Sequence, residues 1–188
     1  IGLTHLSIQD TFDARRLPAQ LTILTHLNLC GGRFFESLPT LPAGLSYLDL
    51  SQNVHLTSSV FHLLPRVLTS LLFRVPIPHR EVEETDLSAL PRGLNSLELL
   101  GSALVSDASM ASLPSTLTSL RSIDCHSLTG QCFVKLPRFL RSLDLPFLTS
   151  LKAEELGDLP PSLTYLSISS QAAIRPPWPE QAPANIRF

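Results

Sequence analysis

A short motif, Leu-Pro followed by three spaced leucines, recurs along this chain at nearly constant intervals. The clearest copy is LPAGLSYLDL, which begins at Leu41, and an earlier copy is LPAQLTILTHLNL at Leu17. The prolines of the series are Pro18, Pro42, Pro65, Pro91, Pro114, Pro137 and Pro160, and their numbers differ in succession by 24, 23, 26, 23, 23 and 23. A nearly fixed period of this length predicts stacked structural units, each of which contacts only its neighbours.

Within each unit the last apolar residues alternate with other residues, which is the two-residue period of a β-strand. The predicted inward pairs are Leu6/Ile8, Leu27/Leu29, Leu48/Leu50, Leu71/Phe73, Leu97/Leu99, Leu143/Leu145 and Leu166/Ile168. Two units leave alternatives open. In the second unit either Leu24 or Leu27 is the first inward residue of the strand. In the sixth unit either Ser122 or Ile123 takes the second inward position.

A repeat of this length has room for one short strand, a turn and a turn or two of helix on the other side. Proline fixes its own φ and favours extended geometry in the residue before it, so each Leu-Pro ends a return segment. The sequences EETDLSALP, SDASMASLP and KAEELGDLP predict short helical pieces. Because strands stack more closely than helices, we expect the array to curve with the strands on the inside.

The pattern L-P-x-x-L-x-x-L-x-L resembles the leucine-rich repeat family, in the variant with Leu-Pro before the strand. The resemblance covers nearly the whole chain and implies an α/β solenoid, a right-handed superhelix with a concave parallel sheet and short helices or turns on its convex side. We expect one domain over residues 1–188, with about eight repeats, cut from a longer array. The family's buried Asn appears as Asn53, and its register counterparts include Gly32, Ser102, Cys125 and Gln171.

With leucines inside, the alternating residues of each strand face the concave surface. Tyrosine brings contact area together with a polar tip, which suits protein recognition. We therefore predict that the partner-binding residues are Tyr47, Asp49, Arg74, Glu98, Arg121, Asp144 and Tyr165. The alternative is that they are ordinary solvated strand positions. The preferred function is a protein-protein interaction scaffold; the alternatives are a substrate-recognition arm of a larger enzyme, such as a ubiquitin ligase or kinase, and a passive spacer.

Composition argues against several other classes. The formal net charge is −2 without a run of Lys or Arg, so we expect no nucleic-acid partner. No apolar run approaches the ~20 residues of a membrane helix, and no targeting signal is visible, which leaves the compartment open and slightly favours the cytoplasm. We expect no cofactor and no metal. Three cysteines, Cys30, Cys125 and Cys132, do not predict a disulfide framework.

Some residues have the chemistry of an active site. His26, Asp49 and Ser51 could form a catalytic triad, and Cys30 could act with His26 as a nucleophile or with His5 as a metal ligand. A smooth sheet surface lacks an oxyanion hole and a water-excluding pocket, so we expect no enzyme. Two other segments remain: an acidic insertion from Arg74 to Leu87, and PPWPEQAP, whose Trp178 either covers the last layer or belongs to a PxxP ligand.

Overall fold

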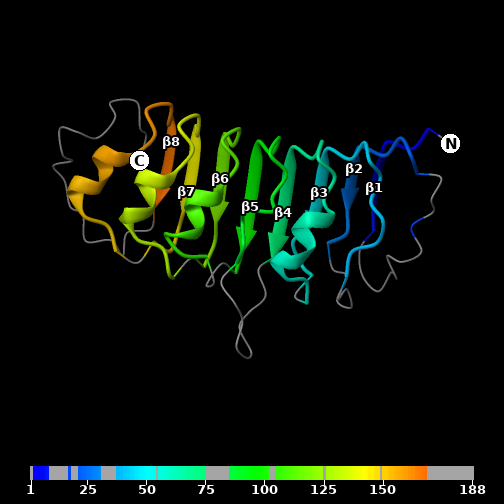
Figure 1. The fold of residues 1–188 in the computed structure, drawn as a ribbon, viewed down its shortest axis with the longest axis horizontal. Helices are drawn as coiled ribbons and strands as arrows, with labels where there is room; N and C mark the ends of the chain where they lie inside the picture. The colour runs from blue at the N-terminus through cyan, green and yellow to red at the C-terminus, as the bar shows by residue number, and fades with distance from the viewer. Residues whose placement is uncertain are drawn as a thin grey trace.

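The computed structural model describes residues 2–8, 17, 21–30, 37–53, 55–74, 85–101, 105–124, 126–148 and 150–168. These residues form one parallel sheet whose eight strands lie side by side in chain order (Figure 1). The strands are β1 (His5–Ser7), β2 (His26–Asn28), β3 (Tyr47–Leu50), β4 (Ser70–Arg74), β5 (Ser96–Leu100), β6 (Ser119–Ser122), β7 (Ser142–Leu145) and β8 (Tyr165–Ile168).

The strands pair in the register that the repeat predicts. The first inward leucine of each strand pairs with the first inward leucine of the next strand, which gives one continuous row from Leu6 to Leu166. The numbers of paired residues differ by 21 at each of the first two steps, and then by 23, 26, 23, 23 and 23. The period is therefore shorter at the N-terminal end, whereas the spacing of the prolines alone predicted a longer one there.

The predicted inward residues form the core. From β3 to β7 the inward leucines and Phe73 are at most 1% exposed, and they belong to one apolar cluster that runs the length of the molecule. Burying a leucine side chain contributes about 1.5–3 kcal/mol, and every layer repeats this contribution. Phe61 closes the layer of β4 by meeting Phe73 edge to face, with ring centroids 4.8 Å apart. The apolar spine is thus continuous from one repeat to the next.

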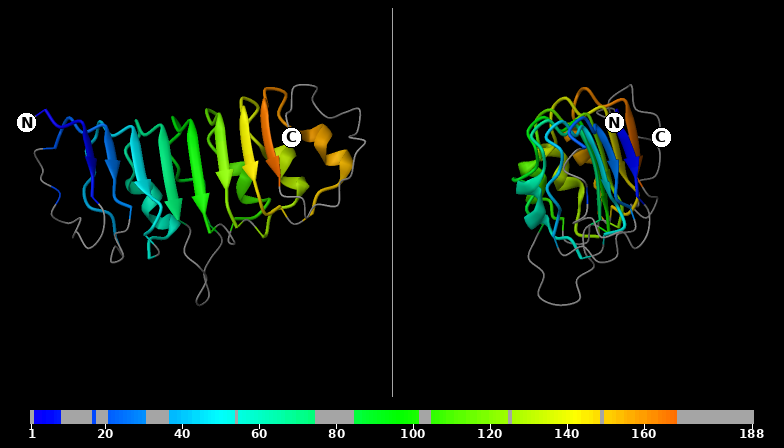
Figure 2. Two further views of the ribbon diagram at one scale, coloured as in Figure 1. Left: turned by 180° about the vertical axis from the view of Figure 1, so that it is seen from behind. Right: turned by 90° about the vertical axis from the view of Figure 1, so that its right-hand side faces the viewer.

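Short 3₁₀ helices lie on the side opposite the strands, as the end-on view in Figure 2 shows. They are η2 (Ser58–Leu63), η3 (Ser109–Ser112), η4 (Gly130–Lys135) and η5 (Ala153–Asp158). The helical predictions for SDASMASLP and KAEELGDLP are confirmed, although the helices are 3₁₀. The prediction for EETDLSALP is wrong over its described part, because residues 85–90 form a turn and irregular chain. We call this side of the molecule the return side.

The structure resolves both ambiguous units. In the second unit Leu27 is the strand leucine, and Leu24 is equally buried at the position of Leu45. The amide of Leu24 donates to the carbonyl of Leu21 just as the amide of Leu45 donates to that of Pro42. Leu21 is therefore the first residue of the turn in this repeat, the position for which the proline spacing predicted Pro18. In the sixth unit Ser122 pairs with Leu99 and is fully buried, so this layer accommodates a serine.

Neighbouring repeats are also joined by side-chain hydroxyl groups where the chain enters each strand. Thr25, Ser46, Thr69, Thr118 and Thr164 each donate to the backbone carbonyl at the same position of the preceding repeat, at 3.0–3.2 Å. The same carbonyl accepts two backbone amides of the next repeat, for example those of Thr25 and His26 on Thr4. We call this row the entry ladder.

Asn53 is buried, and its side-chain amide donates to the carbonyl of Leu29 at 3.0 Å, so it ties two repeats together as expected for such an Asn. Its predicted counterparts Gly32, Ser102, Cys125 and Gln171 lie outside the described residues. So do residues 75–84 of the acidic insertion and the segment around Trp178. Cys132 is buried in η4 and packs in the apolar cluster.

Candidate protein-binding surface

The outward residues of the eight strands form one surface, which we call the sheet face. The left view of Figure 2 shows the strands from this side. The first outward row is His5, His26, Tyr47, Ser70, Ser96, Ser119, Ser142 and Tyr165. The second is Ser7, Asn28, Asp49, Leu72, Glu98, Arg121, Asp144 and Ser167. Both rows were predicted, because a strand alternates its side chains between two faces.

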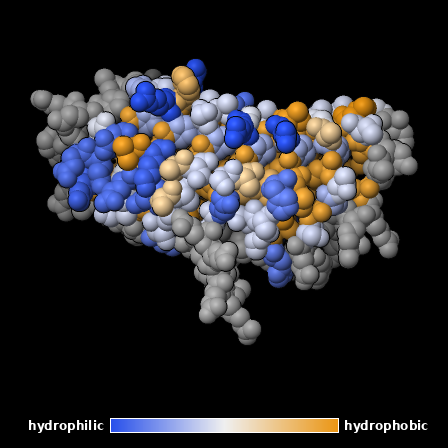
Figure 3. Space-filling view, viewed as in Figure 1, coloured by the Kyte–Doolittle hydropathy of each residue, from blue (hydrophilic) through white to orange (hydrophobic). Residues whose placement is uncertain are grey.

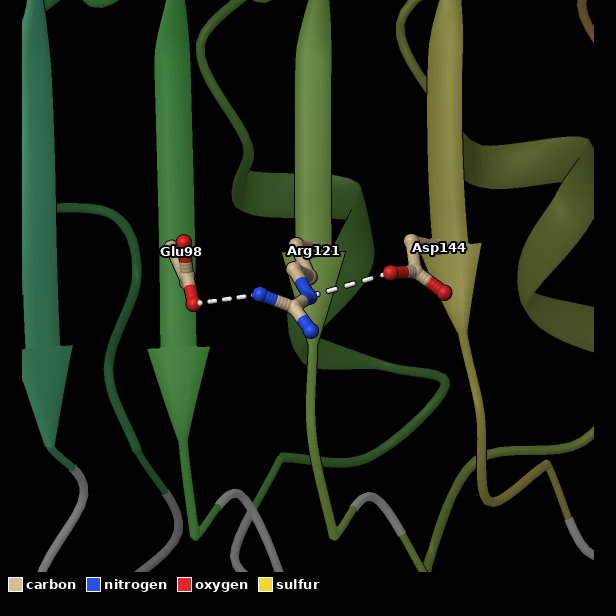
Figure 4. Close-up of polar contacts among 3 residues, drawn as sticks. All are labelled: Glu98, Arg121 and Asp144. Atoms are coloured by element: carbon tan, nitrogen blue, oxygen red, sulfur yellow. Dashed lines mark hydrogen bonds and ion pairs between the residues drawn. The ribbon is translucent and has the colours of Figure 1, made fainter. Parts of the chain in front are cut away.

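Three of the predicted binding residues contact one another. Arg121 in β6 lies between Glu98 in β5 and Asp144 in β7 (Figure 4). Its Nη1 atom is 3.0 Å from Oε1 of Glu98, and its Nε atom is 3.0 Å from Oδ2 of Asp144. The Arg121 side chain is 48% exposed, against 25% and 21% for the two acids. The three side chains are therefore held in place, with the guanidinium most accessible to a partner.

Aromatic rings line the N-terminal end of the same face. The rings of His5 and His26 stack with centroids 4.0 Å apart, and those of His26 and Tyr47 lie 5.7 Å apart. Hydroxyl groups orient both imidazoles, since Nδ1 of each lies 2.9 Å from Oγ1 of the preceding threonine. The phenol of Tyr47 is partly desolvated and faces negative charge, first Asp49 and then Glu98, and these effects raise its pKa above the usual value. Tyr47 is thus a neutral phenol at physiological pH.

The middle of the sheet face is apolar. Leu72 and Leu100 point outward from β4 and β5 and are half-buried. Arg74 pairs in register with Leu100, and its Nε atom is buried without a hydrogen-bond partner in the described part of the chain. The sequence places both leucines at alternating strand positions that face outward. They offer apolar contact area between the aromatic row and the charged trio.

The seven predicted residues do not form one compact site. Glu98, Arg121 and Asp144 form a connected group, and Arg74 lies one strand from Glu98. Tyr47 stands on β3 in the N-terminal half of the sheet face, whereas Tyr165, which is 48% exposed, stands on β8 at the C-terminal end. Asp49 is only 7% exposed, and its Oδ1 atom accepts the amide of Ser51 at 2.8 Å. Asp49 therefore shapes the turn after β3 and presents little surface.

The residues considered for catalysis do not line up. The Ser51 hydroxyl approaches the Cys30 sulfur at 3.5 Å, whereas the hydroxyl beside the His26 ring belongs to Thr25. A triad requires the serine to contact the histidine directly. Among the described residues no group of three His, Cys, Asp or Glu could hold a metal ion. The arrangement of His26, Asp49 and Ser51 thus gives no support for nucleophilic catalysis.

An apolar hollow of about 600 Å³ opens near the N-terminal end, between the turns that precede β2 and β3. Its described lining consists of Leu17, Leu21, Thr22, Leu24, Leu38, Pro39, Thr40, Leu41, Pro42 and Ala43. This lining contains no acid, base or thiol. Apolar surface also gathers towards this end in Figure 3, which views the return side, whereas the opposite end around η5 is hydrophilic.

Comparison with solved structures identifies the architecture. The leucine-rich repeat-containing protein LegL7 from Legionella pneumophila matches with a TM-score of 0.54 and 18% identity, over 89% of this chain and 63% of that protein. The fold is a leucine-rich repeat solenoid. CroV588, described as a novel circular leucine-rich repeat protein, also matches, with a TM-score of 0.48 and 21% identity over 90% of this chain and 27% of its own length.

These leucine-rich repeat proteins are longer than this chain, which spans less than two thirds of each. No family model matches the sequence, and the search of curated proteins found no match. Among the described residues of the solenoid, no helix is long and apolar enough to cross a membrane.

Proposed function

We propose that this leucine-rich repeat solenoid is a protein-interaction scaffold that binds another protein on its sheet face. The observation that supports the proposal is that the inward and outward side chains of each strand have different structural roles. From β2 to β8 the inward leucines are at most 2% exposed and hold the layers together, whereas the outward residues lie outside this core cluster. These outward residues nevertheless vary from strand to strand, with aromatic, apolar and charged groups in separate zones.

The three zones have the chemistry of a protein interface. Tyr47 and Tyr165 are rigid amphipathic groups, Leu72 and Leu100 supply apolar area, and Arg121 is fixed by two carboxylates. Aromatic residues and arginine are enriched among the residues that dominate binding energy, and pre-ordered side chains lose less entropy on binding. A sheet of eight strands spaced ~4.8 Å apart extends for about 34 Å, which is long enough for an interface of standard size.

Site-specific photo-crosslinking tests the proposal directly. A photoreactive amino acid is placed at Ser96 on the sheet face, and at Val134 on the return side, where the side chain is 68% exposed. We expect a defined protein to be captured from the Ser96 position, and its capture to fall in the Tyr47→Ala/Leu72→Ala and Arg121→Ala/Tyr165→Ala variants. Capture of that protein from Val134 alone, or unchanged capture in both variants, would exclude the sheet face.

We also propose that the chain belongs to the repeat variant with Leu-Pro before the strand. At four of the seven register steps the numbers of paired residues differ by 23. In six repeats the proline of the Leu-Pro dipeptide begins a Pro-x-x-Leu turn that a backbone hydrogen bond closes. A regular turn at this position gives the dipeptide a structural role in each of these repeats.

A further inference from the structure

Arginines line the edge of the solenoid at which the chain enters the strands. Each Pro-x-x-Leu turn brings its second residue to this edge, and that residue is Arg66 before β4, Arg92 before β5 and Arg138 before β7. Arg141 directly precedes β7, and all four arginines are exposed. In Figure 3 strongly hydrophilic residues stand along this upper edge. We call these four residues the arginine edge.

The arginine edge carries a charge that nothing in the described structure neutralises. Every described ion pair belongs to Arg121, on the sheet face. The six turns at residues 42–46, 65–69, 91–95, 114–118, 137–141 and 160–164 contain four arginines and no acidic residue, in a chain whose net charge is −2. Lys135 and Asp158 end η4 and η5 on the return side and lie outside these turns.

The fold does not require arginine at these positions. The same turn position is occupied by Ala43, Ser115 and Pro161 in other repeats, and the closing hydrogen bond is 3.0–3.1 Å in all of them. Two of the arginines are instead followed by exposed apolar residues, Val67 at 54% and Phe139 at 69% exposure. Exposed apolar side chains beside unpaired guanidinium groups are typical of a recognition surface.

From these observations we infer that the arginine edge is a second docking surface, which binds an acidic segment of a partner protein that also carries apolar side chains. Guanidinium groups pair with carboxylates through two parallel hydrogen bonds. Arg66 and Arg92 stand on neighbouring repeats and Arg138 two repeats further, so the row is about 15 Å long. An extended peptide of about five residues spans that length. This surface is separate from the sheet face and does not depend on it.

Fluorescence anisotropy with a labelled peptide of six glutamates and two leucines tests the inference on the full chain. We expect saturable binding that the Arg66→Gln/Arg92→Gln variant weakens at least tenfold. The matched control is Lys135→Gln/Lys152→Gln, which removes the same charge from the return side and should change binding less than twofold. Arg66→Lys/Arg92→Lys should retain only part of the affinity, because lysine lacks the planar fork. Circular dichroism verifies that each variant is folded.

Three results would overturn the inference. The first is no saturable binding of the peptide by the unmodified chain. The second is an equal loss in the two glutamine variants, which would reveal general Coulomb attraction. The third is tighter binding of single-stranded RNA or of phosphatidylserine vesicles that is lost in the same arginine variant, which would assign the edge to a different class of partner. Binding of the peptide by the Tyr47→Ala/Leu72→Ala variant should be unchanged. A result against the arginine edge is therefore distinguishable from a result against partner binding on the sheet face.

Discussion

The hydroxyl of Thr116 lies 2.7 Å from the backbone carbonyl oxygen of Arg92, in the preceding repeat. It also lies 2.8 Å from the carbonyl oxygen of Leu94, so one side chain contacts two carbonyl groups of the preceding turn. Ser162 repeats this arrangement on Arg138 and Leu140, at 2.7 Å each. Cohesion between repeats therefore rests on side-chain hydrogen bonds as well as on the leucine spine.

Removing this bridging hydroxyl should destabilise the solenoid. Thr116→Val keeps the shape of the side chain and loses the hydrogen bonds, so we expect the free energy of unfolding to fall by about 1 kcal/mol. Urea denaturation measures the change. Ser115→Ala, one residue earlier at an exposed position, is the control and should alter stability by less than about 0.5 kcal/mol. Equal effects of the two substitutions would contradict the bridging role.

The same relationship predicts a stabilising substitution. Val67 occupies the equivalent position in the fourth repeat and is 54% exposed. Val67→Thr should place a hydroxyl near the carbonyl groups of Ala43 and Leu45 and raise the free energy of unfolding by about 0.5–1 kcal/mol. The midpoint of urea denaturation checks this expectation. A lower midpoint would show that the bridge is specific to the sixth and eighth repeats.

Gly130 marks a close approach between two return segments. A Cβ atom at this position would collide with the carboxylate of Glu155 and would lie 2.8 Å from Cδ1 of Leu151. The carboxylate cannot move away freely, because it accepts the amide of Lys152 at 2.7 Å at the start of η5. We expect Gly130→Ala to lower the free energy of unfolding by about 1–3 kcal/mol, as overpacking does.

Gly93 provides the matched control for this substitution. The nearest atom to its added Cβ is the carbonyl oxygen of Arg66 at 3.6 Å, an ordinary contact. Gly93→Ala should therefore be neutral or stabilising by up to about 1 kcal/mol, since it restricts the unfolded chain. Thermal denaturation of both variants compares them, and a loss of stability at Gly93 as large as at Gly130 would refute the steric explanation.

Tyr47 should titrate above the usual range for a phenol. Its pKa is raised by desolvation first and by Asp49 next. Asp49→Asn should lower this pKa without returning it to the ordinary value, because the desolvation remains. The turn should persist, since Asn28 accepts the amide of Cys30 in the same way one strand earlier. Ultraviolet absorbance of the phenolate in a Tyr165→Phe background isolates Tyr47, because the chain has two tyrosines.

The sign of the stability effect follows from the direction of this shift. The unfolded chain loses its Tyr47 proton near the ordinary pKa, whereas the folded chain retains it to a higher pH. The contribution of Tyr47 to stability is therefore constant below the ordinary pKa and falls as the pH rises from there through the folded value. A Tyr47→Phe variant should lack this alkaline decline, and an identical decline in that variant would assign it to other groups.

The sequence predicted the strands well because leucines at a two-residue spacing leave few alternatives. Both outward rows of the sheet face followed from that register without any further information. Ser122 was ambiguous since a buried serine and a slipped strand have the same local pattern. The mistake at Pro18 arose from the use of proline as a marker, whereas the described turn of that repeat is built from Leu21 to Leu24.

The contacts between outward residues were harder to predict. The sequence identified Glu98, Arg121 and Asp144 as exposed charges, but their mutual pairing depends on rotamers that no periodic pattern specifies. The burial of Asp49 depends on a local turn of its own. The entry ladder was missed although its signal was present, as hydroxyl residues at positions 4, 25, 46, 69, 118 and 164 of the chain.

Two adjacent leucines of β4 provide the most direct test of the account. Leu71 points inward and is fully buried, whereas Leu72 points outward and is half-buried on the sheet face. Leu71→Ala should lower the free energy of unfolding by about 2–5 kcal/mol, the usual effect of a cavity in the core. Leu72→Ala should lower it by less than about 1 kcal/mol. Equal losses in urea denaturation would contradict the division between a buried spine and a free binding surface.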